Sequence, residues 1–256
     1  MSRISETFIK LRKTGKKALI PYIMSGDPSL HATKKLIAGL EQAGADIIEL
    51  GVPFSDPLAD GPTIQRAHER ALQNGITLRK VLPLVKEIRK TTQIPLILMT
   101  YYNPVFKFGV DDFVQKAVEA GVDGVIVPDL IPDEADELID SARQHKLDTI
   151  FLLAPTSTQD RIKKVTRAST GFIYYVSITG ITGGKLSVSG HMQETLSLIK
   201  KSSTKPVAVG FGISKPDEAA KVAGLAEGVV VGSAIVKLIS EGKNLDKFVK
   251  SLRKAV

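Results

Sequence analysis

The sequence of 256 residues contains no cysteine, and only 5% of its residues are aromatic. The absence of cysteine excludes disulfides, thiolate metal sites and cysteine nucleophiles. No uninterrupted apolar run approaches the roughly 18 residues that a membrane span needs. The first residues, MSRISETFIKLRKTGKK, predict an amphipathic helix and a basic turn instead of a secretion signal. We therefore expect a cytoplasmic protein that makes no contact with a membrane.

The composition favours a folded protein with excess positive charge. Hydrophobic residues make up 43% of the chain, enough to bury a full core, and the net charge is +8. Such a charge is typical of nucleic-acid-binding proteins. The lysines and arginines are dispersed, however, and no basic cluster is interleaved with aromatic residues. We expect solvated helix surfaces and no nucleic-acid partner.

Apolar, β-branched segments recur eight times at nearly even spacing and alternate with segments of helical periodicity. Near-continuous apolar strands indicate burial on both faces, which is typical of a parallel sheet covered by helices. Eight such units predict a single α/β domain over residues 1–256, a (β/α)8 TIM barrel with an extra N-terminal helix. A doubly wound open sheet is the alternative. The expected strands lie within 18–26, 46–54, 95–103, 123–130, 148–155, 172–178, 206–213 and 227–234.

Two carboxylates near the end of the second expected strand are candidates for acid–base chemistry. Alternation places Ile47 and Glu49 on one face of that strand. If this face is the barrel interior, burial would raise the pKa of Glu49 and suit it to accept and donate a proton near neutral pH. Asp60, in the stiff loop that follows, could accept a hydrogen bond from a substrate N–H. The alternatives are a buried structural acid for Glu49 and a turn residue or helix N-cap for Asp60.

Glycines follow the sixth, seventh and eighth expected strands, at 179–184, 210–212 and Gly232-Ser233. Glycine lets backbone N–H groups approach an anion closely, and a helix after Ser233 would add the positive end of its dipole. Loops after strands seven and eight are the usual phosphate position in such barrels. Tight turns are the alternative, but three successive strand ends favour phosphate binding. The glycines match neither a P-loop nor a dinucleotide fingerprint.

Aromatic residues cluster within or at the ends of the expected strands. Core packing is the default for such residues, yet the set would also line a flat apolar pocket for a planar substrate that carries a phosphate. These aromatic residues are Tyr22, Tyr101, Tyr102, Tyr174, Tyr175 and Phe211.

The histidines show no metal-ligand spacing, so we expect no metal site and solvated imidazoles. They lie in helical or loop segments with polar neighbours. The four are His31, His68, His145 and His191.

Six motifs, in order along essentially the whole chain, closely resemble the tryptophan synthase α subunit family. The resemblance implies a barrel of the ribulose-phosphate-binding type and an aldolase-type lyase that cleaves indole-3-glycerol phosphate to indole and glyceraldehyde 3-phosphate. The motifs are ELGVPFSDPLADGPTIQ (49–65), MTYYNPVFKFG (99–109), VPDL (127–130), YYVSITGITG (174–183), GFGIS (210–214) and GSAIVK (232–237).

The resemblance also implies roles for residues at the matching positions. Glu49 would be the general acid/base between the glycerol hydroxyl and indole C3, and Asp60 would hold the indole N–H and stabilise positive charge on the ring. Phosphate-binding positions would be Gly183, Gly212, Gly232 and Ser233. Positions lining the indole pocket would be Tyr22, Met99, Tyr101, Tyr174, Thr182 and Phe211.

The same resemblance implies a partner. The α chain would pair with a β subunit, in an α2β2 heterotetramer that makes L-tryptophan, and would pass indole to it. Pyridoxal phosphate would belong to that β subunit, so we expect no cofactor in this chain. A stand-alone lyase and a non-catalytic α-like partner that activates a β subunit are the alternatives, and the intact Glu49 and Asp60 argue against the second.

Overall fold

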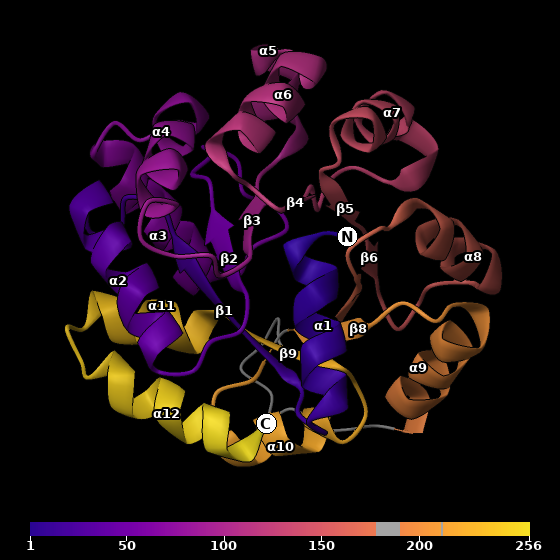
Figure 1. Cartoon of the computed structure of the whole chain (residues 1–256). Helices are drawn as coiled ribbons and strands as arrows, with labels where there is room; N and C mark the ends of the chain where they lie inside the picture. The colour runs from indigo at the N-terminus through magenta and orange to yellow at the C-terminus, as the bar shows by residue number, and fades with distance from the viewer. Residues whose placement is uncertain (178–189, 211) are drawn as a thin grey trace.

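The computed structural model describes residues 1–177, 190–210 and 212–256 (Figure 1). Within these ranges nine parallel strands form one sheet in the order β5-β4-β3-β2-β1-β9-β8-β7-β6. The strands are β1 (Ala18–Met24), β2 (Ile48–Gly51), β3 (Leu96–Met99), β4 (Gly124–Ile126), β5 (Asp148–Ile150), β6 (Leu152–Leu153), β7 (Ile173–Val176), β8 (Val207–Gly210) and β9 (Gly228–Val231).

The two ends of this strand order meet, because β5 and β6 are successive pieces of one segment on either side of Phe151. The sheet is therefore curled into a nearly closed barrel, and the predicted TIM-barrel architecture is confirmed. All eight predicted strand segments contain a strand. The fifth differs in detail: its first piece pairs with β4 and its second with β7.

Helices surround the barrel as an outer ring (Figure 1). Ser29 caps α2 by accepting a hydrogen bond from the Ala32 N–H, a role that serine commonly fills at a helix start. The helices are α1 (Arg3–Lys13), α2 (Leu30–Gln42), α3 (Pro62–Gln73), α4 (Leu78–Ile88), α5 (Tyr102–Phe108), α6 (Val110–Ala120), η1 (Pro132–Glu134), α7 (Asp136–His145), α8 (Gln159–Ala168), α9 (Gly190–Ser202), α10 (Pro216–Ala223), α11 (Ser233–Ser240) and α12 (Leu245–Ala255).

One helix begins later than its sequence pattern indicates. A proline followed by two acids is typical of the first turn of an α-helix, but Pro132-Asp133-Glu134 form the short 3₁₀ turn η1. Ala135 follows with φ −105° and ψ 13°, outside helical values, so α7 begins only at Asp136.

The two faces of each strand pack against different partners. On β2, Ile48 and Leu50 point outward into the layer between sheet and helices, whereas Ile47 points into the barrel. The interior face of Ile47 and Glu49 is therefore confirmed.

Helix α1 closes one end of the barrel (Figure 1). Its apolar residues Ile4, Phe8 and Leu11 are buried among the inward-pointing side chains, and the rings of Phe8 and Phe172 lie 5.8 Å apart. This end carries the amino ends of the strands. The carboxyl ends open at the opposite face.

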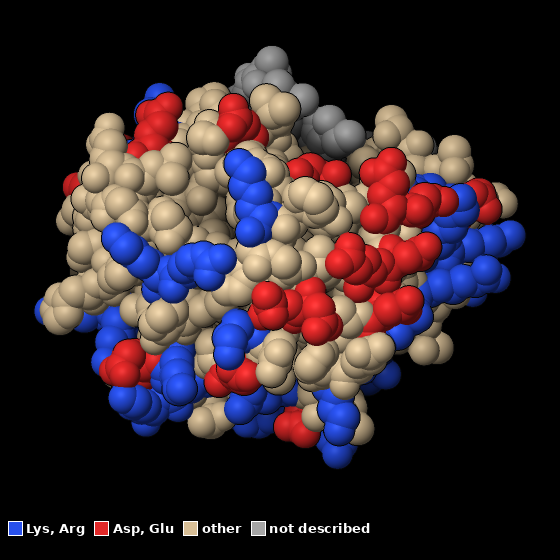
Figure 2. Space-filling model, turned by 90° about the horizontal axis from the view of Figure 1, so that it is seen from above, with Lys and Arg blue, Asp and Glu red and all other residues tan. Residues whose placement is uncertain are grey.

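Charges of both signs are interspersed on the side that carries α5, α6 and their neighbours (Figure 2). Asp and Glu side chains gather right of the centre of this view, and Lys and Arg side chains lie on the left and along the lower and right margins, so the described residues form no continuous basic surface here. Among the described helices, none combines the length and the apolar character that crossing a membrane requires.

Candidate active site

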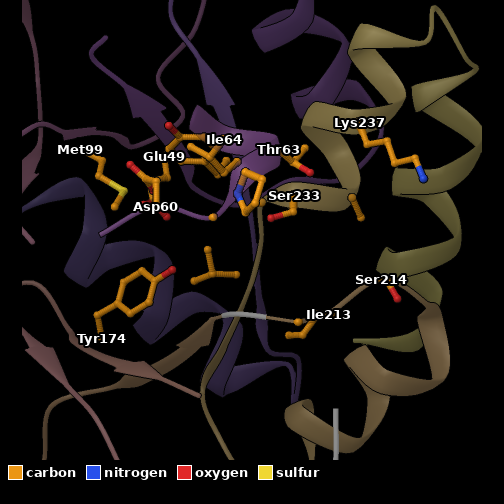
Figure 3. A pocket seen from close by; sticks show the side chains of 17 residues that line it. Glu49, Asp60, Thr63, Ile64, Met99, Tyr174, Ile213, Ser214, Ser233 and Lys237 are labelled. Carbon is orange, nitrogen blue, oxygen red and sulfur yellow. The ribbon is translucent and has the colours of Figure 1, made fainter. Parts of the chain in front are cut away.

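A cavity of about 390 Å³ opens at the carboxyl ends of the strands (Figure 3). Glu49, Asp60, Met99 and Tyr174 lie at one end of it, and Ser233 and Lys237 lie toward the other. The described residues that line it are Tyr22, Glu49, Asp60, Gly61, Pro62, Thr63, Ile64, Met99, Tyr174, Gly212, Ile213, Ser214, Val230, Gly232, Ser233, Ala234 and Lys237.

Glu49 projects from β2 into the floor of this cavity. Its partner across the parallel ladder is Tyr22 on β1, and the residue is only 1% exposed. Within the described part of the chain, its Oε2 atom has no hydrogen-bond partner. Loss of hydration, with a smaller contribution from the negative charge of Asp60, raises the pKa of Glu49 to about 8. The carboxyl is therefore mostly protonated at neutral pH and can donate a proton.

Asp60 lies beside it, at the end of the loop between β2 and α3. The Tyr101 hydroxyl donates to Asp60 Oδ2 at 2.8 Å, and His68 Nε2 lies 3.1 Å from the same oxygen. The Asp60 side chain is 7% exposed, so its carboxylate is held against the cavity wall by side chains of α3 and of the β3–α5 junction.

His68 corrects the expectation that all four histidines are solvated. It is 3% exposed and lies on the buried side of α3, between Asp60 and the Phe54 amide. Of the others, His31 is exposed and His145 lies 3.6 Å from Asp111. The side chain of His191 lies outside the described residues.

Two tyrosines cover the floor of the cavity because glycines leave room for them. A Cβ atom on Gly51 would lie 2.2 Å from the Tyr22 hydroxyl, and one on Gly210 would lie 2.3 Å from the Tyr174 hydroxyl. Burial raises the pKa of both phenols well above the usual value, and the charges of Asp60 and Glu49 raise it further. Both hydroxyls are therefore neutral and can donate hydrogen bonds.

The other end of the cavity carries backbone N–H groups. Gly212 has φ +77°, a conformation that favours glycine. Gly232 is the N-cap of α11, whose first residue is Ser233. The first N–H groups of a helix have no partner within it, so this end attracts an anion. Lys237 adds a positive charge at the rim, with 67% of its side chain exposed.

The structure gathers most of the predicted site residues in this one cavity. Tyr101 is placed differently: it lies behind Asp60, stacked on Phe54 with ring centroids 5.2 Å apart. Thr182, Gly183 and Phe211 lie outside the described residues. The predicted residues among those lining the cavity are Glu49, Asp60, Tyr22, Met99, Tyr174, Gly212, Gly232 and Ser233.

Two residues of the site were missed by the sequence analysis. Lys237 follows Ser233 by four residues, a helical spacing that places both side chains on one face of α11. His68 follows Ile64 by four residues and precedes Ala71 by three, so it belongs to the apolar stripe of α3. Both spacings were visible in the sequence.

Comparisons with known proteins agree with this geometry. The family model described as "Tryptophan synthase alpha chain" matches residues 8–255. The chain belongs to the tryptophan synthase alpha chain family. A relative of that name from Geotalea uraniireducens is 57% identical over 94% of this chain and 90% of its own. Another, from Geobacter sulfurreducens, is 52% identical over 100% of this chain and 99% of its own.

Solved structures are similar over the same length. Tryptophan synthase subunit alpha from Legionella pneumophila has a TM-score of 0.91 at 41% identity and covers 100% of this chain and 98% of its own. A chain of the tryptophan synthase structure from M. tuberculosis in an open form has a TM-score of 0.92 at 39% identity, with 100% and 99% covered. The family predicted from the motifs is confirmed, and with it the prediction of an indole-3-glycerol-phosphate lyase.

Proposed function

We propose that this cavity holds indole-3-glycerol phosphate and cleaves it with Glu49 as the general acid/base. The observation that carries the proposal is the buried Glu49 carboxyl, with a pKa of about 8 and an oxygen that no described residue engages, at the edge of an open cavity. Burying such a group without a partner destabilises the fold. A destabilising group of this kind at a cavity is consistent with a role in the reaction.

The reaction moves one proton from the glycerol hydroxyl to the ring. Neutral Glu49 donates its proton to indole C3, and the ring becomes a cation whose charge is centred on the N–H. The resulting carboxylate then removes the proton from the hydroxyl next to C3. The electrons of that O–H bond form the aldehyde, the carbon–carbon bond breaks, and its electron pair returns to the ring to give indole. Glu49 ends protonated, as it began.

Asp60 is placed to stabilise the intermediate cation. Its carboxylate lines the same end of the cavity as Glu49 and can accept a hydrogen bond from the indole N–H. Because the charge appears on the ring only after C3 is protonated, this contact is stronger in the transition state than in the ground state. Tyr22, Met99 and Tyr174 would pack against the ring.

The backbone groups of Gly212, Gly232 and Ser233 would hold the phosphate, with Gly183 completing the set and Thr182 and Phe211 completing the indole pocket. Lys237 at the rim adds long-range attraction for the dianion. Binding the phosphate at the end of the cavity away from Glu49 fixes where the glycerol chain can lie. The reacting carbon is thereby placed near the carboxyl.

A β subunit is the proposed partner, in an α2β2 assembly, and pyridoxal phosphate belongs to it and not to this chain. Leu58, Phe106 and Ile131 are 91%, 64% and 37% exposed. They follow β2, β3 and β4, which are neighbours in the sheet, so they lie on the same side of the barrel mouth. Exposed apolar side chains at one edge fit a protein interface. One barrel domain over residues 1–256 in the cytoplasm completes the proposal.

An indole-release assay on the purified chain, alone and with a β subunit, tests this function. Asp60→Asn should lower kcat/KM by at least 10²-fold, because it removes the carboxylate charge and keeps the shape. Ser233→Asp should raise KM for the phosphorylated substrate by repulsion. An unchanged kcat/KM in Asp60→Asn would remove Asp60 from the mechanism. No indole release from the wild-type chain under either condition would favour a non-catalytic partner.

A further inference from the structure

His68 is a buried polar side chain outside the set of residues that line the cavity. It lies on α3 and is 3% exposed, and its neighbours along the helix face, Ile64, Ala67 and Ala71, are apolar. A buried imidazole needs hydrogen-bond partners for both ring nitrogens. Both partners, the Phe54 N–H and the Asp60 carboxylate, belong to the loop between β2 and α3.

The backbone determines which nitrogen of His68 carries the proton. The Phe54 N–H lies 2.9 Å from Nδ1 and can only donate, so Nδ1 accepts. In the neutral imidazole the proton is then on Nε2. Nε2 lies 3.1 Å from Asp60 Oδ2 and therefore donates to it.

Tyr101 donates to the same carboxylate oxygen. Its hydroxyl lies 2.8 Å from Asp60 Oδ2 and accepts a hydrogen bond from the Ala59 N–H at 3.0 Å. No residue within 1–177, 190–210 and 212–256 donates to Oδ1. Two donors on Oδ2 thus fix the rotation of the carboxylate and leave Oδ1 for another donor.

These contacts join both ends of the loop to the carboxylate. Phe54, near the start of the loop, is linked to Asp60 through His68, while Ala59, near its end, is linked to Asp60 through Tyr101. The Phe54 and Tyr101 rings stack, and the His68 ring meets Tyr101 edge-on at 6.2 Å. The position of Asp60 therefore depends on side chains from α3 and from the end of β3.

We propose that His68 is a positioning residue for the lyase reaction: its Nε2–H holds Asp60 so that Oδ1 faces the substrate N–H. This inference rests on the proposed role of Asp60 and adds the group that orients it. Tyr101 shares the task, which gives this tyrosine a role behind Asp60 in place of a role in the pocket wall.

Two variants, each with a smaller amide side chain in place of the imidazole, test the two hydrogen bonds of His68 one at a time. His68→Asn keeps an acceptor near Nδ1 for the Phe54 N–H but cannot reach Asp60. His68→Gln places an amide N–H near Nε2 for Asp60 but gives up the acceptor for Phe54. We expect kcat/KM to fall roughly tenfold or more in His68→Asn and to stay within about threefold of wild type in His68→Gln, since donors to a carboxylate are the stronger class.

A double-mutant cycle distinguishes positioning from general structural damage. The ligand is indole-3-propanol phosphate, which keeps the ring N–H and the phosphate but has no hydroxyl for cleavage. His68→Asn should weaken its binding in the wild-type background and have no further effect in Asp60→Asn. Equal losses in both backgrounds, or a wild-type kcat/KM in His68→Asn, would overturn the proposal. An unchanged kcat/KM in Asp60→Asn would remove Asp60 from the mechanism and overturn this proposal with it, whereas the proposed function itself fails only if the wild-type chain releases no indole.

A measurement on the wild-type protein keeps the proposal testable if either variant fails to fold. The ¹⁵N chemical shifts of the His68 ring report which nitrogen is protonated. We expect Nε2–H with an unprotonated Nδ1, and a change in the Nε2–H resonance when indole-3-propanol phosphate binds. A ring protonated on Nδ1 alone, or an Nε2–H resonance that ignores the ligand, would contradict the proposal.

Discussion

Both ends of the barrel contain buried acids, but the two ends differ in whether the carboxyl oxygens have hydrogen-bond partners. Asp46, half-buried just before β2, and Glu49, buried within β2, stand three residues apart. At the amino end, Asp46 Oδ2 accepts hydrogen bonds from the Leu19 N–H and from Arg253. At the carboxyl end, Glu49 Oε2 accepts none from the described residues.

The other acids at the closed end are also satisfied. Asp123 is bound by Arg89, by Arg3 and by the Leu96 N–H, and Ser2 donates to Asp148. These contacts tie α1 and the starts of the strands together. Burial alone therefore does not distinguish a catalytic acid from a structural one in this barrel, and the proposed role of Glu49 rests on burial without a partner next to a cavity.

The largest expected effect comes from Glu49→Gln at the open end. Indole release should fall by roughly 10²- to 10⁴-fold, because the substitution keeps the shape and removes the proton donor. A kcat close to wild type would show that this carboxyl is as structural as those at the closed end.

The same variant tests the cost of burying Glu49. Its folded pKa, about 8, exceeds the ordinary value of 4.5, so the contribution of this group to stability is full below about pH 4.5 and is lost as pH rises toward 8. Urea unfolding should show Glu49→Gln gaining about 3 kcal/mol relative to wild type between pH 4.5 and pH 7. A difference that does not change with pH would contradict the raised pKa.

Arg89→Met tests the closed end. It leaves the Asp123 carboxylate short of a charged partner in a site where the two side chains are 10% and 4% exposed. We expect the free energy of unfolding to fall by about 3 kcal/mol, with kcat/KM per folded molecule unchanged. A large loss of kcat/KM with intact stability would mean that the two ends are not separable.

The smallest expected effect concerns the coupling of the two acids at the mouth. The proposed mechanism begins with protonated Glu49, so kcat/KM should fall as pH rises through about 8. The charge of Asp60 contributes to that raised pKa, so Asp60→Asn should shift the titration of Glu49 to lower pH. Carboxyl ¹³C NMR of labelled glutamate would follow this titration directly. No shift would show that the two groups do not interact.

Much of the fold and of the reactive end could be predicted because the signals are local. Alternation along β2 depends on neighbouring residues only, so it gave the inward direction of Glu49 and, from that, its raised pKa. The glycines that follow the strands are likewise a signal that depends only on neighbouring residues. Their assembly around one cavity follows from the barrel itself, in which all strands open at the same face.

The contacts of Asp60 could not be predicted in this way. Tyr101 lies 41 residues beyond Asp60 in the sequence, and only the packing of β3 beside β2 brings its hydroxyl to the carboxylate. His68 was expected to be solvated because its immediate neighbours, Arg66, Ala67, Glu69 and Arg70, include three charged residues. The helical period, and not the charge of adjacent residues, determines which side chains of α3 face the barrel, and it places His68 on that buried face.

The position of helix α1 limits where small molecules can enter and leave the barrel. Among the described residues, Ile4, Phe8 and Leu11 fill the amino end of the barrel, and the cavity opens at the carboxyl ends of the strands. The filled amino end leaves the opening at the carboxyl ends of the strands as the described route for substrate and products. A protein that binds over the opening at the carboxyl ends of the strands would therefore affect both substrate entry and product release. The filled amino end is what makes these two steps share one opening.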